Sequence, residues 1–204
     1  MAEKSYFRVE NGRINRSDFN IDWGWPYTVN VNKMMEIAEK NGLKAIEISS
    51  KGKDEIGKRF SAMSLKYGDY ELEKVYQSSK EYKNSGRHLE LLECTPKEAK
   101  TITEDLKKKD KQIGIWYEGK MYPSLQNRFI YTLMYYDAVV QSVSLEDLDE
   151  LSKYDVYMDI IFKWSKPGAT QAESLAIVLY IYELYGMLPP LDAVKDVIKN
   201  TLRM

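Results

Sequence analysis

Four polar side chains recur at helical spacing in residues 72–80 and are of types that could line a catalytic pocket. Glu73, Gln77 and Lys80 lie at offsets of four and seven, which places them on one face of a helix, and Tyr76 lies beside them. A carboxylate, an amide, an amine and a phenol so arranged can bind and cleave a polar substrate. The same pattern is also typical of a solvated helix face, so spacing alone leaves both interpretations open.

Two further segments carry groups that could complete such a site. Ser49-Ser50-Lys51 follows a predicted strand, and the carboxyl ends of strands commonly bind phosphates and sugars. The segment of residues 155–159 (Asp155-Val156-Tyr157-Met158-Asp159) is predicted to be a strand. Because side chains alternate with a period of two, its two acids and its tyrosine lie on the same side. Each segment alone is more often structural. Together they indicate a tyrosine-rich cleft lined by carboxylates, with no particular reaction specified.

Composition excludes several classes of protein. The 204 residues carry a formal charge of −1, so no global basic field indicates a nucleic-acid partner, and binding to nucleic acid would depend on local patches. The single cysteine, Cys94, excludes an internal disulfide, and the single histidine, His88, argues against a His-rich metal centre. No apolar run approaches the roughly 20 residues of a membrane span, and no signal peptide is evident. Composition leaves a carboxylate magnesium site possible. We nevertheless expect a cytoplasmic protein with no membrane partner, no metal and no cofactor.

The helix and strand signals predict an α+β fold, a single domain that is mostly helical with a few short strands, over residues 23–204. Residues 1–22 are predicted to form a polar N-terminal segment, loosely ordered over 1–20, and residues 23–27 a rigid aromatic turn. Strands are predicted at 44–50, 60–65, 112–117 with a return through 121–122, and 154–162. Helices are predicted at 32–41, where Gly42 ends the helix, and on the segment that carries Glu73, after a turn at Gly68. Further helices are predicted at 95–109, 125–141, 170–185 and 191–202, and a shorter one begins at residue 144.

The clearest helix start is Thr95-Pro96-Lys97-Glu98. The threonine caps the helix, proline occupies its first position and glutamate its third. The same helix ends in the basic run Lys107-Lys108-Lys109-Asp110-Lys111. We interpret this run as a solvated face that complements the helix dipole, and only secondarily as a contact to nucleic acid.

The three polar segments also carry a family resemblance. The chain resembles the NADAR domain family, named for its association with NAD and ADP-ribose and also called YbiA-like. The similarity begins near Trp23 and covers roughly residues 23–185. It passes through Glu47-Ile48-Ser49-Ser50-Lys51 and Phe60-Ser61-Ala62-Met63, and then the family's most recognisable string, Glu73-x-x-Tyr76-Gln77-x-x-Lys80. It extends through Pro96–Lys100, Tyr131–Ala138, Tyr154-Asp155, Asp159 and Gln171-Ala172.

The chain departs from the family pattern at two places. Met158-Asp159-Ile160 stands where the wider family often has Trp-Gly-Asp-Gly, and Met63 replaces an expected aromatic residue. Both changes keep the carboxylate but alter the wall that would stack a base or a nicotinamide-like ring. They affect the expected substrate more than the expected fold.

The resemblance is closest to the branch of antitoxins paired with DNA-guanine ADP-ribosyltransferase toxins. It implies a DNA ADP-ribosyl glycohydrolase that removes ADP-ribose from guanine in single-stranded or flipped DNA, with free ADP-ribose as product and a cognate toxin as partner. Cleavage at the anomeric carbon builds oxocarbenium character, which a carboxylate stabilises. The implied catalytic residues are Glu73, then Asp159, and Lys51, which would bind the diphosphate or attack the opened ribose as an amine. The implied binding residues are Ser49, Ser50, Ser61, Tyr76, Gln77, Lys80, Asp155 and Tyr157.

Other functions remain open at this point. The chain could act as an antitoxin or as a stand-alone counter-defence protein of a virus. It could also be an N-glycosidase on a riboflavin-pathway metabolite, as some NADAR relatives are, although the basic run of residues 107–111 weakly favours nucleic acid. A non-catalytic ADP-ribose reader and a structural interaction protein complete the alternatives.

Overall fold

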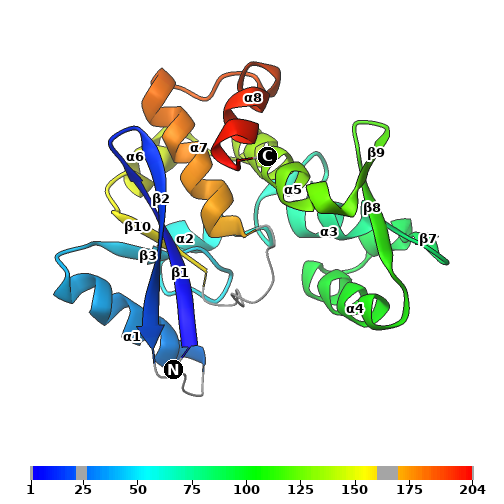
Figure 1. Cartoon of the computed structure of the whole chain (residues 1–204), viewed down its shortest axis with the longest axis horizontal. Coiled ribbons are helices and arrows are strands. Elements are labelled where there is room, and N and C mark those ends of the chain that lie inside the picture. Colours follow the sequence, from blue (N-terminus) through cyan, green and yellow to red (C-terminus); the bar gives the residue numbers. More distant parts are fainter. Residues whose placement is uncertain (1, 22–26, 160–169, 204) are drawn as a thin grey trace.

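A four-stranded sheet in the order β2-β1-β10-β3 organises one half of the computed structural model, which describes residues 2–21, 27–159 and 170–203 (Figure 1). β1 (Ala2–Glu10) pairs antiparallel with both β2 (Arg13–Ile21) and β10 (Val156–Met158), whereas β3 (Ala45–Glu47) lies parallel to β10. The helices α1 (Tyr27–Lys40) and α7 (Gln171–Tyr185) both contact this sheet.

The two faces of this sheet bury different apolar clusters. Val156 and Met158 pack against α1 residues that include Met34, whereas Tyr157 between them joins the main core on the opposite face. This alternation follows from the two-residue period of a strand. α7 contributes seven buried apolar residues to the main core, as expected for a helix that is apolar on most sides.

The N-terminal segment is a β-hairpin, so the expectation of loose order over residues 1–20 is wrong. Asn11 and Gly12 have φ values of 53° and 67°, the left-handed conformation that a tight two-residue hairpin turn requires. The strands pair from Ala2↔Ile21 to Glu10↔Arg13, and β1 also pairs with β10 at Tyr6↔Met158. Backbone hydrogen bonds to β10 stabilise a segment whose polar composition concealed its extended structure.

The second half of the molecule contains an antiparallel sheet in the order β7-β6-β8-β9, and a short hairpin of β4 and β5. α5 contacts α3, α7 and α8, and so connects the two halves (Figure 1). The remaining elements are α2 (Glu55–Arg59), β4 (Lys66–Tyr67), β5 (Tyr70–Glu71), α3 (Leu72–Ser78), β6 (Lys80–Tyr82), β7 (Gly86–Arg87), η1 (Leu89–Glu93), α4 (Pro96–Lys109), β8 (Gln112–Tyr117), β9 (Lys120–Pro123), η2 (Ser124–Gln126), α5 (Asn127–Ser142), α6 (Leu145–Leu151) and α8 (Leu191–Thr201).

The prediction of an α+β fold is confirmed, and helices form wherever they were expected. The capping box at Thr95 is complete, because its hydroxyl accepts from the Glu98 N–H and the Glu98 carboxylate accepts from the Thr95 N–H. A similar box at Ser144 opens α6. No helix in the described ranges is both long enough and apolar enough to cross a bilayer.

Two predicted strands differ from the structure. Residues 60–65 form turns, because the N–H groups of Ser64 and Leu65 both donate to the Ser61 carbonyl, and pairing begins only at Lys66. The predicted strand of residues 154–162 is ordered as β10 over Val156–Met158, and its last three residues lie outside the described part of the chain. Residues 23–26 of the expected aromatic turn also lie outside it.

Candidate functional site

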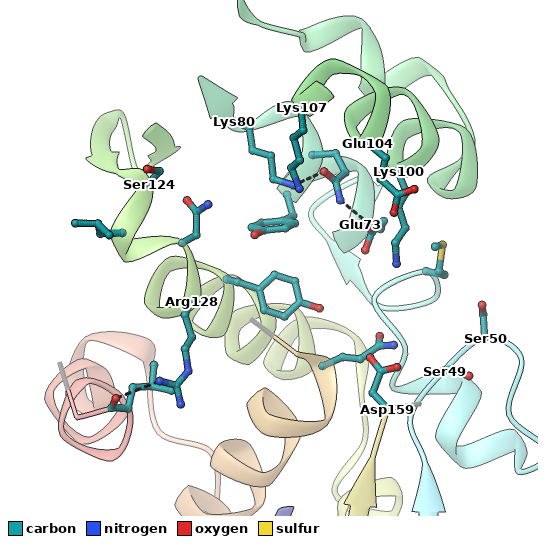
Figure 2. A pocket seen from close by; sticks show the side chains of 18 of the residues that line it. Ser49, Ser50, Glu73, Lys80, Lys100, Glu104, Lys107, Ser124, Arg128 and Asp159 are labelled. Atoms are coloured by element: carbon teal, nitrogen blue, oxygen red, sulfur yellow. Dashed lines mark hydrogen bonds between the residues drawn. The ribbon is translucent and has the colours of Figure 1, made fainter. Parts of the chain in front are cut away.

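A cleft of about 650 Å³ lies where the two halves of the molecule meet (Figure 2). Its size is within the range typical of small-molecule sites. The lining residues come from β6, from α3, α4, η2, α5 and α7, from the loops that follow β3, α2 and β10, and from the chain after α8: Ser49, Ser50, Met63, Glu73, Tyr76, Gln77, Lys80, Lys100, Glu104, Lys107, Ser124, Leu125, Asn127, Arg128, Tyr131, Asp159, Gln171, Leu202 and Arg203.

One end of the cleft is formed where the parallel strands β3 and β10 end. Their register pairs Glu47 with Met158, so the residues that follow each strand emerge at the same edge of the sheet. Ser49 and Ser50 therefore lie near Asp159, and all three line the cleft (Figure 2). This arrangement places two hydroxyls beside a carboxylate.

A buried carboxyl supports this end of the cleft from below. Glu47 is 1% exposed, and its Oε1 accepts a hydrogen bond of 2.8 Å from the Ser49 hydroxyl. Burial raises the pKa of Glu47 to about 7, the negative charge of Asp159 adds to this rise, and the Ser49 hydrogen bond opposes it. α2 packs so closely on this strand end that a Cβ at Gly57 would overlap the Glu47 carbonyl oxygen.

The opposite wall carries a hydrogen-bonded chain of three buried side chains. The Gln77 Nε2 donates to Glu73 Oε1 at 2.7 Å, and the Lys80 Nζ donates to Gln77 Oε1. Glu73 is 6% exposed, and no described residue donates to its other oxygen, Oε2. One carboxylate oxygen is thus oriented by the protein while the second remains for a ligand.

Lys80 was expected on the helical face of Glu73, but it begins β6 instead. The hydroxyls of Ser78 and Ser79 donate to the carbonyls of Val75 and Tyr76 and terminate α3. The chain then enters β6, and the Lys80 Nζ still meets Gln77. The expected grouping is correct, although the helix alone does not produce it.

The surroundings of Lys80 disfavour its protonated form. The side chain is 1% exposed, and its Nζ lies 4.2 Å from the centroid of the Tyr76 ring. Burial, reinforced by the positive charges of Lys107 and Lys100, holds the pKa of Lys80 well below its ordinary value, whereas Glu73 opposes this effect. An anion placed between Lys80 and Lys107 would remove their repulsion.

Two tyrosine rings form the floor between the walls. Tyr76 and Tyr131 pack edge to face, with centroids 4.7 Å apart and planes at 71°. Burial and the charge of Glu73 raise the pKa of both phenols, which therefore stay protonated near neutral pH. The rings offer an apolar, aromatic surface to a sugar or base.

α4 presents a third polar row. Lys100, Glu104 and Lys107 are spaced by four and three residues, so they share one helical face, and all three line the cleft (Figure 2). Lys107 belongs to the basic run interpreted above as a solvated helix end. Lys107 is exposed, as that interpretation expects, and it also lines the cleft beside Lys80.

The start of α5 closes the cleft on the remaining side. Arg128 makes a bidentate ion pair with Glu173, with N–O distances of 2.8 and 2.5 Å, which fixes the guanidinium at the wall. The nearby Gln171 Oε1 accepts from the Ala62 N–H at 2.9 Å and so anchors the loop that precedes Met63.

Most of the predicted site residues meet in this cleft, but four do not line it. Ser61 is fully buried with its Oγ 3.1 Å from that of Ser64, and Lys51 is exposed. The Asp155 carboxylate accepts from the Lys44 N–H at 2.7 Å, outside the cleft. The Tyr157 hydroxyl donates to the carbonyls of Leu151 and Tyr154 in the core. Of residues 155–159, only Asp159, which follows β10, lines the cleft, because Tyr157 faces the core.

Sequence reasoning missed the cleft residues of α4, η2 and the start of α5, together with Arg203. Their only advance signals were the basic run that includes Lys107 and the family-like segments Pro96–Lys100 and Tyr131–Ala138. Nothing in the local pattern of Leu125 or Arg128 distinguished them from ordinary surface residues.

Comparison with known proteins supports the resemblance noted from the sequence. Residues 27–197 match the model of the family described as "DarT1-associated NADAR antitoxin", which is well over half of the chain. No curated protein gives a significant match. The chain therefore belongs to the DarT1-associated NADAR antitoxin family.

Proposed function

We propose that this antitoxin is a DNA ADP-ribosyl glycohydrolase that releases ADP-ribose from guanine and so reverses the modification made by its toxin. Family membership implies a cognate ADP-ribosyltransferase toxin as partner. The observation that carries the catalytic proposal is the Glu73 carboxylate, buried in a cleft that also holds Lys80, Lys100 and Lys107. A carboxylate beside several lysines suits a substrate with a sugar and a diphosphate.

The reaction breaks the bond between the anomeric ribose carbon and a guanine nitrogen. The bonding electron pair leaves with the nitrogen, and the ribose carbon gains oxocarbenium character that an anionic oxygen stabilises. In this proposal Glu73 Oε2 faces the sugar and takes a proton from the attacking water. The guanine nitrogen gains a proton in return, so the products are ADP-ribose and unmodified DNA.

The other cleft residues have supporting roles in the proposal. Gln77 orients Glu73 through the 2.7 Å hydrogen bond to Oε1. Asp159 with Ser49 and Ser50 binds ribose hydroxyls from the opposite wall. Lys80 and Lys107 bind the diphosphate, because a dianion there offsets their mutual repulsion.

Lys51 is not assigned a catalytic role in this scheme, because it is exposed and does not line the cleft. Its positive charge stabilises the ionised form of Glu47 below the Ser49-Ser50 end. Its proposed contribution is to hold that end of the cleft in place, with no covalent bond to ribose.

The test is a single-turnover assay with an oligonucleotide that carries ADP-ribosylated guanine, with products identified by mass spectrometry. Glu73→Gln should keep the fold, checked by circular dichroism, and slow release by about 100-fold or more. Glu104→Gln is the matched control, because Glu104 lines the same cleft on an exposed turn of α4 and should cost less than about threefold. Full activity of Glu73→Gln would remove Glu73 from the chemistry. Tight ADP-ribose binding by a wild-type protein that releases nothing would instead indicate a non-catalytic reader.

A further inference from the structure

Exposed apolar side chains gather at one end of the molecule, away from the cleft. In the described residues, ten large apolar side chains are at least 39% exposed. Five of the ten lie where α5 and α7 end and where α6 begins, and none of the five lines the cleft: Val140, Leu145, Leu184, Tyr185 and Met187. Single exposed apolar residues are ordinary, whereas a gathering of them is typical of a contact surface.

Hydrogen bonds hold these segments together, and we call the surface that they form the α5–α7 end. The Tyr182 hydroxyl of α7 donates to Asp149 of α6 at 2.7 Å, and the Tyr136 hydroxyl of α5 donates to the Pro189 carbonyl after α7 at 2.6 Å. Figure 1 shows α6 beside the C-terminal part of α7. Both α5 and α7 begin at residues that line the cleft, and at 1.5 Å per residue their last turns lie roughly 20 Å farther along.

The α5–α7 end is also negatively charged. Residues 129–152 contain five acidic residues and residues 171–194 contain three, and neither range contains Lys, Arg or His. Three of these acids pair with basic residues outside the two ranges: Asp147, Glu173 and Asp192. Four others are exposed: Glu146, Asp149, Glu150 and Glu183.

The backbone adds to this negative charge. Neither α5 nor α7 has a basic residue in its last turn, so nothing in these turns offsets the negative end of either helix dipole. A surface that is both apolar and negative repels nucleic acid and anionic membranes, and it is complementary to a basic protein surface.

We propose that the α5–α7 end binds the basic surface of the cognate toxin, so that the antitoxin contacts the toxin directly and does not act on its product alone. The family implies that toxin as a partner, and an enzyme that modifies DNA needs a basic surface to attract the phosphates. The contact is separate from the glycohydrolase reaction and shares with it only a toxin that acts on DNA. Because the α5–α7 end lies away from the cleft, substrate can still enter while the toxin is bound.

A second copy of this chain fits the α5–α7 end less well. It would have to offer its own lysine run, residues 107–111, to the acidic residues. Lys107 lines the cleft, so such a contact would obstruct the site of one copy. The charge distribution therefore favours a different protein as the occupant.

The test is calorimetric titration of this chain with a purified DarT1 toxin whose transferase activity has been abolished by mutation, without DNA, at low and at high salt. The wild type should bind, and salt should weaken the binding. Leu184→Ser and Glu183→Lys should each weaken it by about tenfold or more, through loss of an apolar contact and reversal of a charge. Leu89→Ser and Glu93→Lys are the matched controls, because both residues are exposed on η1, and Leu89 is 52% exposed against 54% for Leu184.

The outcomes separate this contact from the proposed reaction. A wild type that does not bind the toxin, or controls that lose as much affinity as the two variants, would overturn the contact. Light scattering that shows a dimer of the wild type, dissociated by Leu184→Ser, would overturn it in favour of self-association. Release of ADP-ribose from a modified oligonucleotide, measured without toxin, should be unchanged in Leu184→Ser. A wild type that releases nothing would reject the glycohydrolase, whereas the calorimetric result would still decide the contact.

Discussion

Lys80 Nζ donates a hydrogen bond to Gln77 Oε1, although Gln77 lies in α3 and Lys80 begins β6. The same glutamine donates to Glu73, so one amide connects a buried amine with a buried carboxylate. The amide has one acceptor and one donor group, and each faces the partner that needs it. Gln77 therefore determines how close the two ionisable groups approach and which oxygen of Glu73 faces the cleft.

Replacing Gln77 should destabilise the protein as well as impair the site. Gln77→Leu keeps a similar volume but leaves two buried polar groups without their partner, so we expect a loss of about 3 kcal/mol in the free energy of unfolding. Chemical denaturation measures this loss. Gln141→Leu is the comparison. The Gln141 amide donates to Asp137 and accepts from the Gly68 N–H, but it is exposed, so this variant should lose less free energy of unfolding. Equal losses in the two variants would contradict the role of the buried chain.

Lys107 should add to the effect of burial in lowering the pKa of Lys80. Its positive charge lowers the pKa of Lys80, so Lys107→Met should raise that pKa and reduce the neutral amine present at a given pH. The rate at which an amine-reactive reagent labels Lys80, followed by mass spectrometry across a pH series, should shift to higher pH. Lys108→Met is the control, because Lys108 pairs with Asp105 at 2.7 Å and is not among the lining residues. A shift to lower pH, or none, would contradict the coupling.

Glu47 should make stability depend on pH. Its pKa is raised from 4.5 to about 7, so the folded state retains a proton that the unfolded state has released. The stabilisation that comes from this retained proton is fully present below about pH 4.5, is lost as the pH rises through 7, and is absent at higher pH. At about 1.4 kcal/mol per pKa unit, the change amounts to roughly 3 kcal/mol.

Denaturation of the wild type and Glu47→Gln between pH 5 and 8 tests this expectation. The glutamine keeps an oxygen that accepts from Ser49, but it does not titrate. The wild type should lose stability relative to the variant as pH rises. Glu71 does not interfere with this measurement. Its hydrogen bond from Lys66 lowers its pKa to about 2, so its contribution to stability changes only below pH 5. Parallel pH profiles for the two proteins would contradict a titrating Glu47.

Local sequence patterns were sufficient to predict the helices and the chemical groups at the centre of the site. Capping boxes at Thr95 and Ser144 and apolar periodicity depend on neighbours within a few residues, so local pattern was sufficient to predict them. The family-like string further identified Glu73, Tyr76, Gln77 and Lys80 as a group. The N-terminal hairpin escaped prediction because its order depends on pairing with β10, about 150 residues away along the chain.

Which polar groups face the cleft depends on the fold as a whole. Asp155, Tyr157 and Asp159 share a strand period, yet the packing of the sheet sends Tyr157 into the core and leaves Asp159 at the cleft. Lys107 and Leu125 are exposed, and their place in the cleft could not be predicted because their neighbours there come from distant segments. The sequence therefore specified the chemical groups, while long-range packing selected those that meet, since burial and proximity depend on the whole fold.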